Sequence, residues 1–275
     1  MANLELLLVG SGPKPDIGCS SPVKWVTCPE WFGASAARNL AASMATSEYL
    51  AFLDDDVVLD SQWCESALRV FQHETVGAVS GQAIVNLSRF GLGYIPREMM
   101  WVVGGTYFDE TKVSEVAGAA GMNLCVRRKS FERVGGYNPL IGPKGDRPER
   151  ITWNRLGAEE DDLVLKIHNL CAERVLFNPS MLVYHKLRLE SLMPKGLLKR
   201  SLHVGLNRAH IHHLYPEIGS ETDIRNVLAL SRTVMGSALT LPRHVARNWK
   251  TVSFITLVVF GFGIGYVAGR LRFRK

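Results

Sequence analysis

Short apolar runs alternate with longer amphipathic stretches along the first two thirds of the chain. The run Tyr49–Leu53 is almost wholly apolar, which predicts a short strand buried on both faces of a parallel sheet. Apolar residues at helical spacing predict a helix at Glu159–Cys171. Further strands are predicted at Leu4–Val9, Val23–Thr27, Val76–Val85, Met99–Val103, Val175–Phe177 and Met181–Tyr184, and further helices at Gly33–Ala45, Ser61–Gln72, Lys129–Val134 and Pro194–Tyr215. The alternation indicates an α/β fold.

Three successive carboxylates, Asp54, Asp55 and Asp56, follow the predicted strand Tyr49–Leu53. Adjacent like charges at a strand end repel one another and are partly desolvated, so they need compensation. Hard oxygen ligands suit Mg²⁺ or Mn²⁺, and open α/β sheets bind ligands at the carboxyl ends of their strands. The acidic turn therefore predicts a metal or nucleotide site, with a solvated turn as the alternative.

Four acids open the predicted helix Glu159–Cys171, a position that also suits the helix dipole. Asp162 lies four residues before Lys166, which predicts a surface ion pair. Glu159 and Glu160 lie four residues before Leu163 and Val164, at the edge of the apolar stripe, and Asp161 is intermediate. A carboxylate at the edge of a buried face is costly without a function.

Two further polar residues are candidates for the same region. His185 follows a predicted strand, as the acidic turn does, and it is either a ligand or a structural histidine. Arg38 lies in an alanine-rich predicted helix, where it can bind a phosphate or lie at the surface.

The C-terminal part of the chain has a different character. The predicted helix Pro194–Tyr215 is basic and amphipathic, which indicates either a membrane-surface helix or a helix packed on the domain. Thr251–Gly269 carries no charge over nineteen residues, just enough to span a membrane, and a buried soluble helix is the alternative. Gly261, Gly265 and Gly269 form a small-residue stripe that lets another helix approach closely.

Composition narrows the class of partner and the compartment. The net charge of +6 makes a polyanionic partner plausible. The five cysteines form no CxxC pair, which favours reduced thiols over disulfides or a zinc site. No basic-then-apolar signal peptide is found at the start. We expect a cell-membrane protein whose catalytic domain lies on the cytoplasmic side.

Several short motifs, in this order and at this spacing, resemble the inverting family 2 glycosyltransferases with the GT-A fold. The similarity covers roughly Leu4 to Arg188, and the tail is loosely similar to archaeal enzymes that extend lipid-linked glycans. The motifs are Gly33-Ala-Ser-Ala-Ala-Arg-Asn, Phe52-Leu-Asp-Asp-Asp, Gly121-Met-Asn, Arg127-Arg128, Val134-Gly-Gly-Tyr137, Glu159-Glu-Asp-Asp-Leu163 and His185. The resemblance implies a Rossmann-like mixed sheet flanked by helices in residues 1–188, a basic helical region in 189–250 and a transmembrane helix in 251–269.

The resemblance also implies roles for single residues. Glu160 takes the position of the catalytic carboxylate, with Asp161 as the alternative. Asp56 and His185 would hold Mg²⁺ or Mn²⁺ on the diphosphate of the donor. Asp54, Asp55 and Arg38 would lie near the nucleotide, and Asn123 near the sugar or acceptor. The implied partners are a UDP- or GDP-linked sugar, a lipid-linked or polysaccharide acceptor and the membrane, and no nucleic acid is expected.

One departure from the family pattern concerns the start of the chain. The strand and helix that normally precede the strand matched by Leu4–Val9 are not found, and Gly10-Ser-Gly-Pro replaces the usual acidic pair. Two alternatives to an active transferase remain open. One is a non-catalytic glycosyltransferase-like membrane subunit. The other is a phosphatase of the haloacid dehalogenase type, in which Asp54 would be the nucleophile.

Overall fold

The computed structural model describes residues 4–16, 23–29, 32–87, 90–106, 111–142, 157–187, 192–216 and 241–273. The chain divides into two compact units. The first comprises Met1–Asp54, Ser61–Gly81 and Lys112–Met181, and the second comprises Asp55–Asp60, Gln82–Thr111 and Leu182–Lys275. The predicted domain boundaries at residues 188 and 250 stay predictions, and residues 217–240 of the predicted basic region lie outside the described residues.

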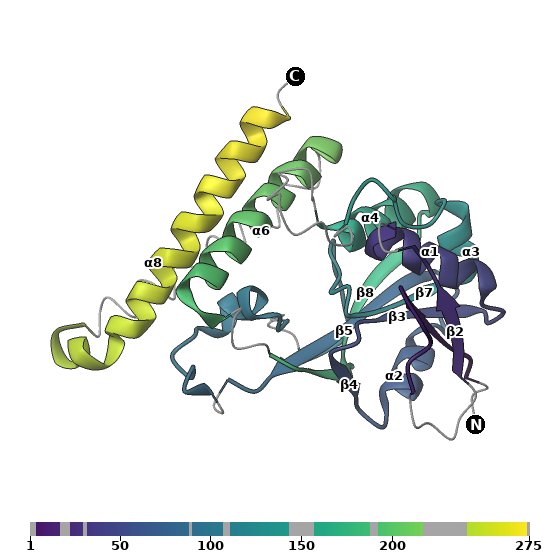
Figure 1. Ribbon diagram of the computed structural model, residues 1–275, viewed down its shortest axis with the longest axis horizontal. Helices are drawn as coiled ribbons and strands as arrows, with labels where there is room; N and C mark the ends of the chain where they lie inside the picture. The colour runs from purple at the N-terminus through teal and green to yellow at the C-terminus, as the bar shows by residue number, and fades with distance from the viewer. Residues whose placement is uncertain are drawn as a thin grey trace. The chain divides into compact units, whose positions relative to one another are not determined.

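A mixed sheet lies at the centre of the first unit (Figure 1). Its strand order is β3-β7-β5-β8, and β6 pairs with β8. Both β3 and β5 run antiparallel to β7, so they are parallel to each other. A separate parallel pair is formed by β1 and β2. The bounds are β1 Leu6–Gly10, β2 Val23–Thr27, β3 Tyr49–Leu53, β5 Val76–Val85, β6 Ser114–Glu115, β7 Asn123–Arg127 and β8 Arg174–His185.

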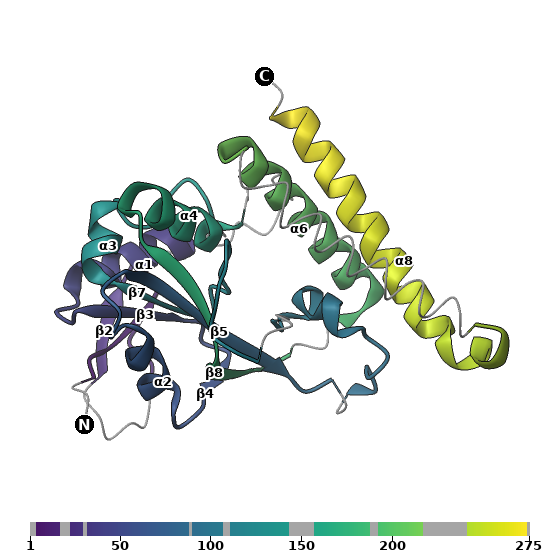
Figure 2. The ribbon, with the colours of Figure 1, turned by 180° about the vertical axis from the view of Figure 1, so that it is seen from behind.

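Helices cover both faces of this sheet (Figures 1 and 2). On one face Leu124 and Val126 of β7 are fully buried in a core shared with α1, α3 and α4. On the other face the alternate residue Asn123 accepts a hydrogen bond from the indole of Trp63 in α2. The bounds are α1 Gly33–Met44, α2 Trp63–Val70, α3 Arg128–Arg133 and α4 Glu159–Cys171. The mixed, helix-flanked α/β sheet predicted from the sequence is confirmed.

The strand that precedes the acidic turn has one buried face instead of the two predicted. Leu50 and Phe52 of β3 are buried, whereas Ala51 between them is exposed. The strand lies at the end of the sheet order, with β7 as its neighbour. The prediction of a strand buried on both faces is therefore wrong. Alanine is apolar but occurs at exposed as well as buried positions, so the apolar run did not reveal the exposed face.

Two other predicted elements differ from those observed. Met99–Val103 forms no strand but belongs to a 3-10 helix, η3 (Arg97–Val103), which starts after Pro96 and ends at Gly104 with φ of 81°. Residues 175–184, predicted as two short strands, lie in the single strand β8. The short strands β4 (Val57–Leu59) and β6 were not predicted.

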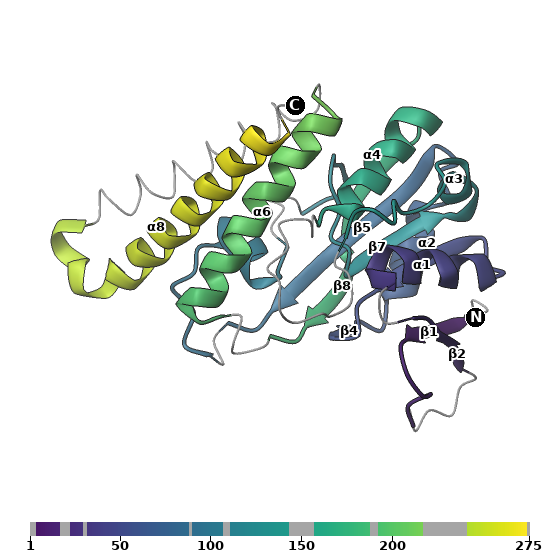
Figure 3. The same ribbon diagram turned by 45° about the horizontal axis from the view of Figure 1, so that its top comes forward.

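The second unit contains β4, the last residues of β5 and β8, and η3. It also contains two long helices, α6 (Pro194–Leu214) and α8 (Leu241–Arg272), which lie side by side in all three views (Figure 3). The two helices pack in parallel, since Ser201 contacts Gly261 and Ala209 contacts Gly269 further along. A Cβ placed on Gly269 would lie 2.5 Å from the Cβ of Ala209, and one on Gly265 would clash with the backbone of α6. The predicted small-residue stripe is confirmed as a helix-packing face, and α6 is the helix that occupies it.

One segment of α8, Trp249–Arg272, is long and apolar enough to cross a membrane by its length and composition, with a mean hydropathy of 2.0. About one third of its most apolar window is buried. Exposed apolar side chains follow one face of the helix at Phe260, Ile264, Val267 and Leu271. The segment includes the predicted span Thr251–Gly269.

Candidate active site

Arg38 of α1 lies at the centre of three carboxylates in the first unit. Its Nη2 atom lies 3.0 Å from Asp54 Oδ1, at the end of β3. Its Nη1 atom lies 3.1 Å from Glu159 Oε1 and 3.2 Å from Glu160 Oε1, in the first turn of α4. Three segments that are far apart in the sequence thus place one guanidinium among three acids. We call these four residues the acid cluster.

Tyr137 lies against Arg38, and Asn39 of α1 fixes its backbone. The Asn39 side chain donates to the carbonyl of Tyr137 (2.8 Å) and accepts from its backbone N–H (2.9 Å). Gly136, with φ of 70°, provides the left-handed turn that precedes Tyr137. The guanidinium carbon of Arg38 lies 5.4 Å from the centre of the Tyr137 ring. The Arg-Asn pair of α1 therefore has two tasks, one in the acid cluster and one in fixing the tyrosine.

Burial dominates the electrostatics of the acid cluster. It raises the pKa of Glu160 to about 8, the charge of Glu159 adds to this, and Arg38 opposes it. For Arg38, burial lowers the pKa, but the neighbouring charges, first that of Glu160, outweigh it and the pKa is raised. Burial also raises the pKa of the Tyr137 hydroxyl well above its usual range. Glu160 is thus a carboxylate that accepts a proton readily near neutral pH.

The loop from Gly118 to Gly121, before β7, contacts Glu160 and Asp161, which the sequence left as alternatives for the catalytic carboxylate. The Oδ1 atom of Asp161 accepts a hydrogen bond from the backbone N–H of Ala119 (3.2 Å). A Cβ on Gly121 would clash with the carboxyl group of Glu160. Both acids thus contact the loop, and Glu160 in addition pairs with Arg38.

The other two acids in the first turn of α4, Glu159 and Asp162, are both buried. Asp162 forms the predicted ion pair with Lys166, at 2.7 Å between Oδ2 and Nζ, but its side chain is only 3% exposed. The prediction of a surface position for Asp162 is therefore wrong. Glu159, which the sequence placed at the edge of the buried face but gave no role, is 4% exposed and joins the acid cluster. Its place beside Glu160 in the first turn of α4 was the available signal.

A second group of candidate residues lies in the second unit. His185, at the end of β8, has its Nε2 atom 3.4 Å from Asp56 Oδ1. Strand β4 pairs with β8 and places Val57 opposite His185, and Lys186 donates a backbone hydrogen bond to the carbonyl of Asp56 (2.8 Å). The predicted pair Asp56 and His185 is thus brought together by strand pairing.

The tautomer of His185 fits a metal ligand. Its Nδ1 atom lies 2.9 Å from the carbonyl oxygen of Gly104, which can only accept, so Nδ1 carries the proton. The lone pair is then on Nε2, on the side of Asp56. Carboxylate and imidazole are suitable ligands for Mn²⁺, and a second hydrogen bond of this kind commonly orients a metal-bound histidine. Within the described ranges, no three His, Cys, Asp or Glu side chains gather as a ligand set.

The other two predicted residues have different surroundings. Asp55 is exposed. Asn123 is fully buried: its Oδ1 accepts from the Trp63 indole and its Nδ2 donates to the carbonyl of Met181, both at 2.7 Å. The Asn123 amide therefore joins α2 to β8 and does not belong to the acid cluster.

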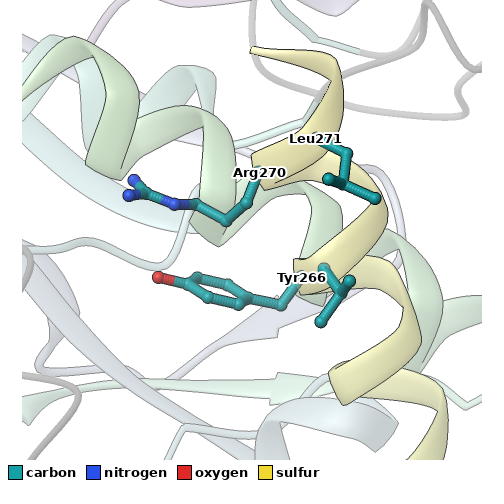
Figure 4. Close-up of a pocket in the computed structure, with 4 residues that line it drawn as sticks. Tyr266, Arg270 and Leu271 are labelled. Atoms are coloured by element: carbon teal, nitrogen blue, oxygen red, sulfur yellow. The ribbon is translucent and has the colours of Figure 1, made fainter. Parts of the chain in front are cut away.

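A hollow of about 230 Å³ lies on the last turns of α8. It is lined by Tyr266, Val267, Arg270 and Leu271, all from this one helix, and by none of the predicted site residues. Figure 4 shows Tyr266 and Arg270 extending from one side of the helix and Leu271 from the other. The hydroxyl of Tyr266 lies 2.9 Å from Nδ1 of His212, which ties α8 to α6.

Comparison with known proteins shows a family to which part of this chain is similar. Residues 19–135 match the sequence profile of Glycosyl transferase family 2. This part of the chain is therefore similar to family 2 glycosyltransferases.

The relatives in sequence and structure agree with this class. The chain is 28% identical over 192 residues to a glucosyl-dolichyl phosphate glucuronosyltransferase of Haloferax volcanii, covering 69% of this chain and 59% of that protein. It is 24% identical over 166 residues to the succinoglycan biosynthesis protein ExoM of Rhizobium meliloti, covering 59% and 47%. The chain thus spans about half to three fifths of the length of these relatives.

A solved structure supports the GT-A-like fold. The mannosyltransferase PcManGT from Pyrobaculum calidifontis, in complex with GDP-Man and Mn²⁺, superposes with a TM-score of 0.57 at 16% identity. The match covers 97% of this chain and 77% of that one.

Proposed function

We propose that this protein is an inverting glycosyltransferase. It would move a sugar from a UDP- or GDP-linked donor to an acceptor hydroxyl on a lipid-linked glycan or another cell-envelope saccharide. The observation that carries the proposal is the acid cluster, in which burial raises the pKa of one carboxylate, Glu160, to about 8. This cluster occurs in a chain that matches the family 2 profile.

Glu160 is the proposed general base. It takes the proton from the acceptor hydroxyl while that oxygen attacks the anomeric carbon of the donor. One C–O bond forms to the acceptor and the C–O bond to the nucleoside diphosphate breaks, so the sugar is transferred with inversion. Glu159 favours proton uptake through its negative charge, and Arg38 fixes the carboxyl group at 3.2 Å. Positioned proton transfer of this kind contributes about a hundred- to ten-thousand-fold in rate.

Donor binding is assigned to the acidic turn and its partners. Asp54 and Asp55 would contact the nucleotide, with Arg38 nearby. Asp56 and His185 would hold a divalent metal ion, Mg²⁺ or Mn²⁺. When bound, such an ion neutralises negative charge on the departing diphosphate. The ligand types and the His185 tautomer support this assignment, as does the Mn²⁺ in the PcManGT structure.

A lipid-linked acceptor and a membrane location are proposed from the tail and from one relative. The relative from Haloferax volcanii is named for a dolichyl phosphate substrate, and Trp249–Arg272 has the length and composition of a membrane helix. The proposed location is the cell membrane, with the catalytic domain on the cytoplasmic side. For the phosphatase alternative, Asp54 would have to act as a nucleophile, although it is engaged by Arg38 at 3.0 Å.

Replacing Glu160 tests the proposal. Glu160→Gln keeps the size and hydrogen-bonding capacity of the side chain but removes the base. With detergent-solubilised protein, UDP- and GDP-linked sugars and glucosyl-dolichyl phosphate as the acceptor probe, we expect transfer to fall by at least about a hundredfold. Nucleotide affinity should stay within about threefold of the parent, because the base acts in the chemical step.

Two further variants decide between the acids of α4 and between the alternatives. Glu65→Gln, at a carboxyl that is 72% exposed, is the control and should transfer sugar at the parent rate. Parent activity in Glu160→Gln together with an inactive Asp161→Asn would move the role of base to Asp161. A parent protein that binds nucleotide but neither transfers sugar nor hydrolyses a donor would indicate the non-catalytic subunit.

A further inference from the structure

Arg200 of α6 lies beside the Asp56–His185 pair, and the acid cluster does not involve it. Arg200, Asp56 and His185 all belong to the second unit. Gly104, which ends η3, shows how they meet. A Cβ placed on Gly104 would clash with the His185 ring and would lie 3.6 Å from Nη2 of Arg200. His185 and Arg200 therefore both lie against Gly104, which has no side chain of its own.

Packing on both sides of Arg200 fixes this position. Its neighbours on α6, Leu197 and Ser201, are buried, and Leu197 belongs to the same core as Val103 of η3. Gly104 follows Val103 directly, with a positive φ of 81°. The turn of α6 that carries Arg200 is thus packed against the same core as η3, which brings its guanidinium to the end of η3.

The charge of Arg200 is poorly balanced. Among the residues that the structure describes, no carboxylate lies within ion-pair distance of Arg200. Burial lowers the pKa of its guanidinium, and the charge of Asp56 opposes this. Asp56 is itself engaged by His185 at 3.4 Å. A partly buried guanidinium without its own carboxylate is stabilised when an anion binds it.

We propose that Arg200 binds a phosphate group of a reactant beside the Asp56–His185 pair. A guanidinium presents two parallel N–H donors that match two phosphate oxygens, and such charge-assisted bonds are among the stronger hydrogen bonds in proteins. Two sources share this chemistry, the diphosphate of the nucleotide donor and the phosphate of a lipid-linked acceptor. The identity of these reactants rests on the proposed function, whereas the anion site itself rests on the geometry around Gly104.

Equilibrium binding to the full-length protein in detergent tests the site in two arms. One arm uses UDP and GDP with Mn²⁺, and the other uses farnesyl phosphate, with farnesol as its uncharged control. Arg200→Gln removes the positive charge and the pair of parallel N–H donors, which we call the fork. Lys199→Gln is the matched control, because it removes an exposed charge from the next position of the same helix. Arg200→Lys keeps the charge but not the fork.

We expect Arg200→Gln to weaken binding in one arm by about ten- to a hundredfold, the range of a charge-assisted hydrogen bond. Lys199→Gln should stay within about twofold, and Arg200→Lys should lie between the two. Loss in the nucleotide arm alone assigns the donor diphosphate, and loss in the farnesyl phosphate arm alone assigns the lipid phosphate. A thermal unfolding midpoint equal to that of the parent shows that Arg200→Gln is folded.

Three results would overturn the inference: equal affinities of Arg200→Gln and the parent in both arms, an equal loss in Lys199→Gln, or a parent that binds neither probe. Failure of the proposed function has a different signature. In that case the parent binds a phosphate probe through Arg200 but transfers no sugar.

Discussion

Replacing Arg38 by glutamine should destabilise the first unit in a way that depends on pH. The substitution leaves the acid cluster without its cation. Of the three carboxylates, Asp54 is 40% exposed and contributes little, whereas Glu159 and Glu160 are 4% and 18% exposed. Removing one partner from a buried ion pair costs about 3–5 kcal/mol, and the partial exposure of the site places the expected loss near the lower end.

The sign of the pH dependence follows from the carboxyl pKa values. Without Arg38, which opposes the rise, the pKa of Glu160 moves further above that of the unfolded chain. The folded protein then binds more protons than the unfolded protein, so the free energy of unfolding falls as the pH rises. We expect Arg38→Gln to cost about 3 kcal/mol at about pH 8 and only about 1 kcal/mol at about pH 5, since each pKa unit corresponds to about 1.4 kcal/mol.

Urea unfolding followed by tryptophan fluorescence at both pH values measures this loss. Arg69→Gln is the matched control, because Arg69 pairs with Glu65 on α2 and both side chains are 72% exposed. It should cost less than about 0.5 kcal/mol at either pH. A loss for Arg38→Gln that is the same at both pH values, or no larger than that of the control, would refute the electrostatic account of the cluster.

Three further predictions concern catalysis, the metal ion and the tail. A base must be ionised to act, so transfer by the parent should increase as the pH rises towards about 8, the pKa of Glu160; a flat pH–rate profile would argue against Glu160. Asp56→Ala should abolish metal-dependent nucleotide binding with little effect on the fold, and affinities unchanged by EDTA in both proteins would exclude the metal role. The full-length chain should remain in membranes after a carbonate wash, whereas a chain ending at Lys250 should be released or become salt-extractable. Complete extraction of the full-length chain would contradict a spanning helix.

Local pattern was sufficient to predict much of the fold. The bounds of β2, β3, β5 and α4 are those expected from the sequence. Each of these elements has a strong pattern of its own, an apolar run between polar residues or an amphipathic stripe. The run Met99–Val103 was misread because a short apolar segment has the same appearance in a strand and in a buried turn of helix. Pro96 before it and Gly104 after it were the signals for a helix.

The candidate site was predictable as a set of residues but not as a set of contacts. Spacing along α4 placed Glu160 at the edge of the buried face, where the structure has it. It could not show that Arg38 pairs with Asp54, Glu159 and Glu160, because these contacts join segments up to 122 residues apart. Asp162 was misplaced for a related reason: an i,i+4 ion pair has the same spacing whether or not another part of the chain covers it.

The close contact between α6 and α8 has a consequence for how the protein would respond to its lipids. Glycines on both helices bring the backbones together, so neither helix can slide along the other without a clash. Where α8 lies in a bilayer, its depth therefore also sets the level of Arg200, since the next residue, Ser201, contacts Gly261 of α8. A thicker or thinner bilayer shifts the depth at which a helix of fixed length rests. The rate of transfer to a lipid-linked acceptor should then vary with the acyl chain length of the surrounding lipid, while hydrolysis of a soluble donor should not.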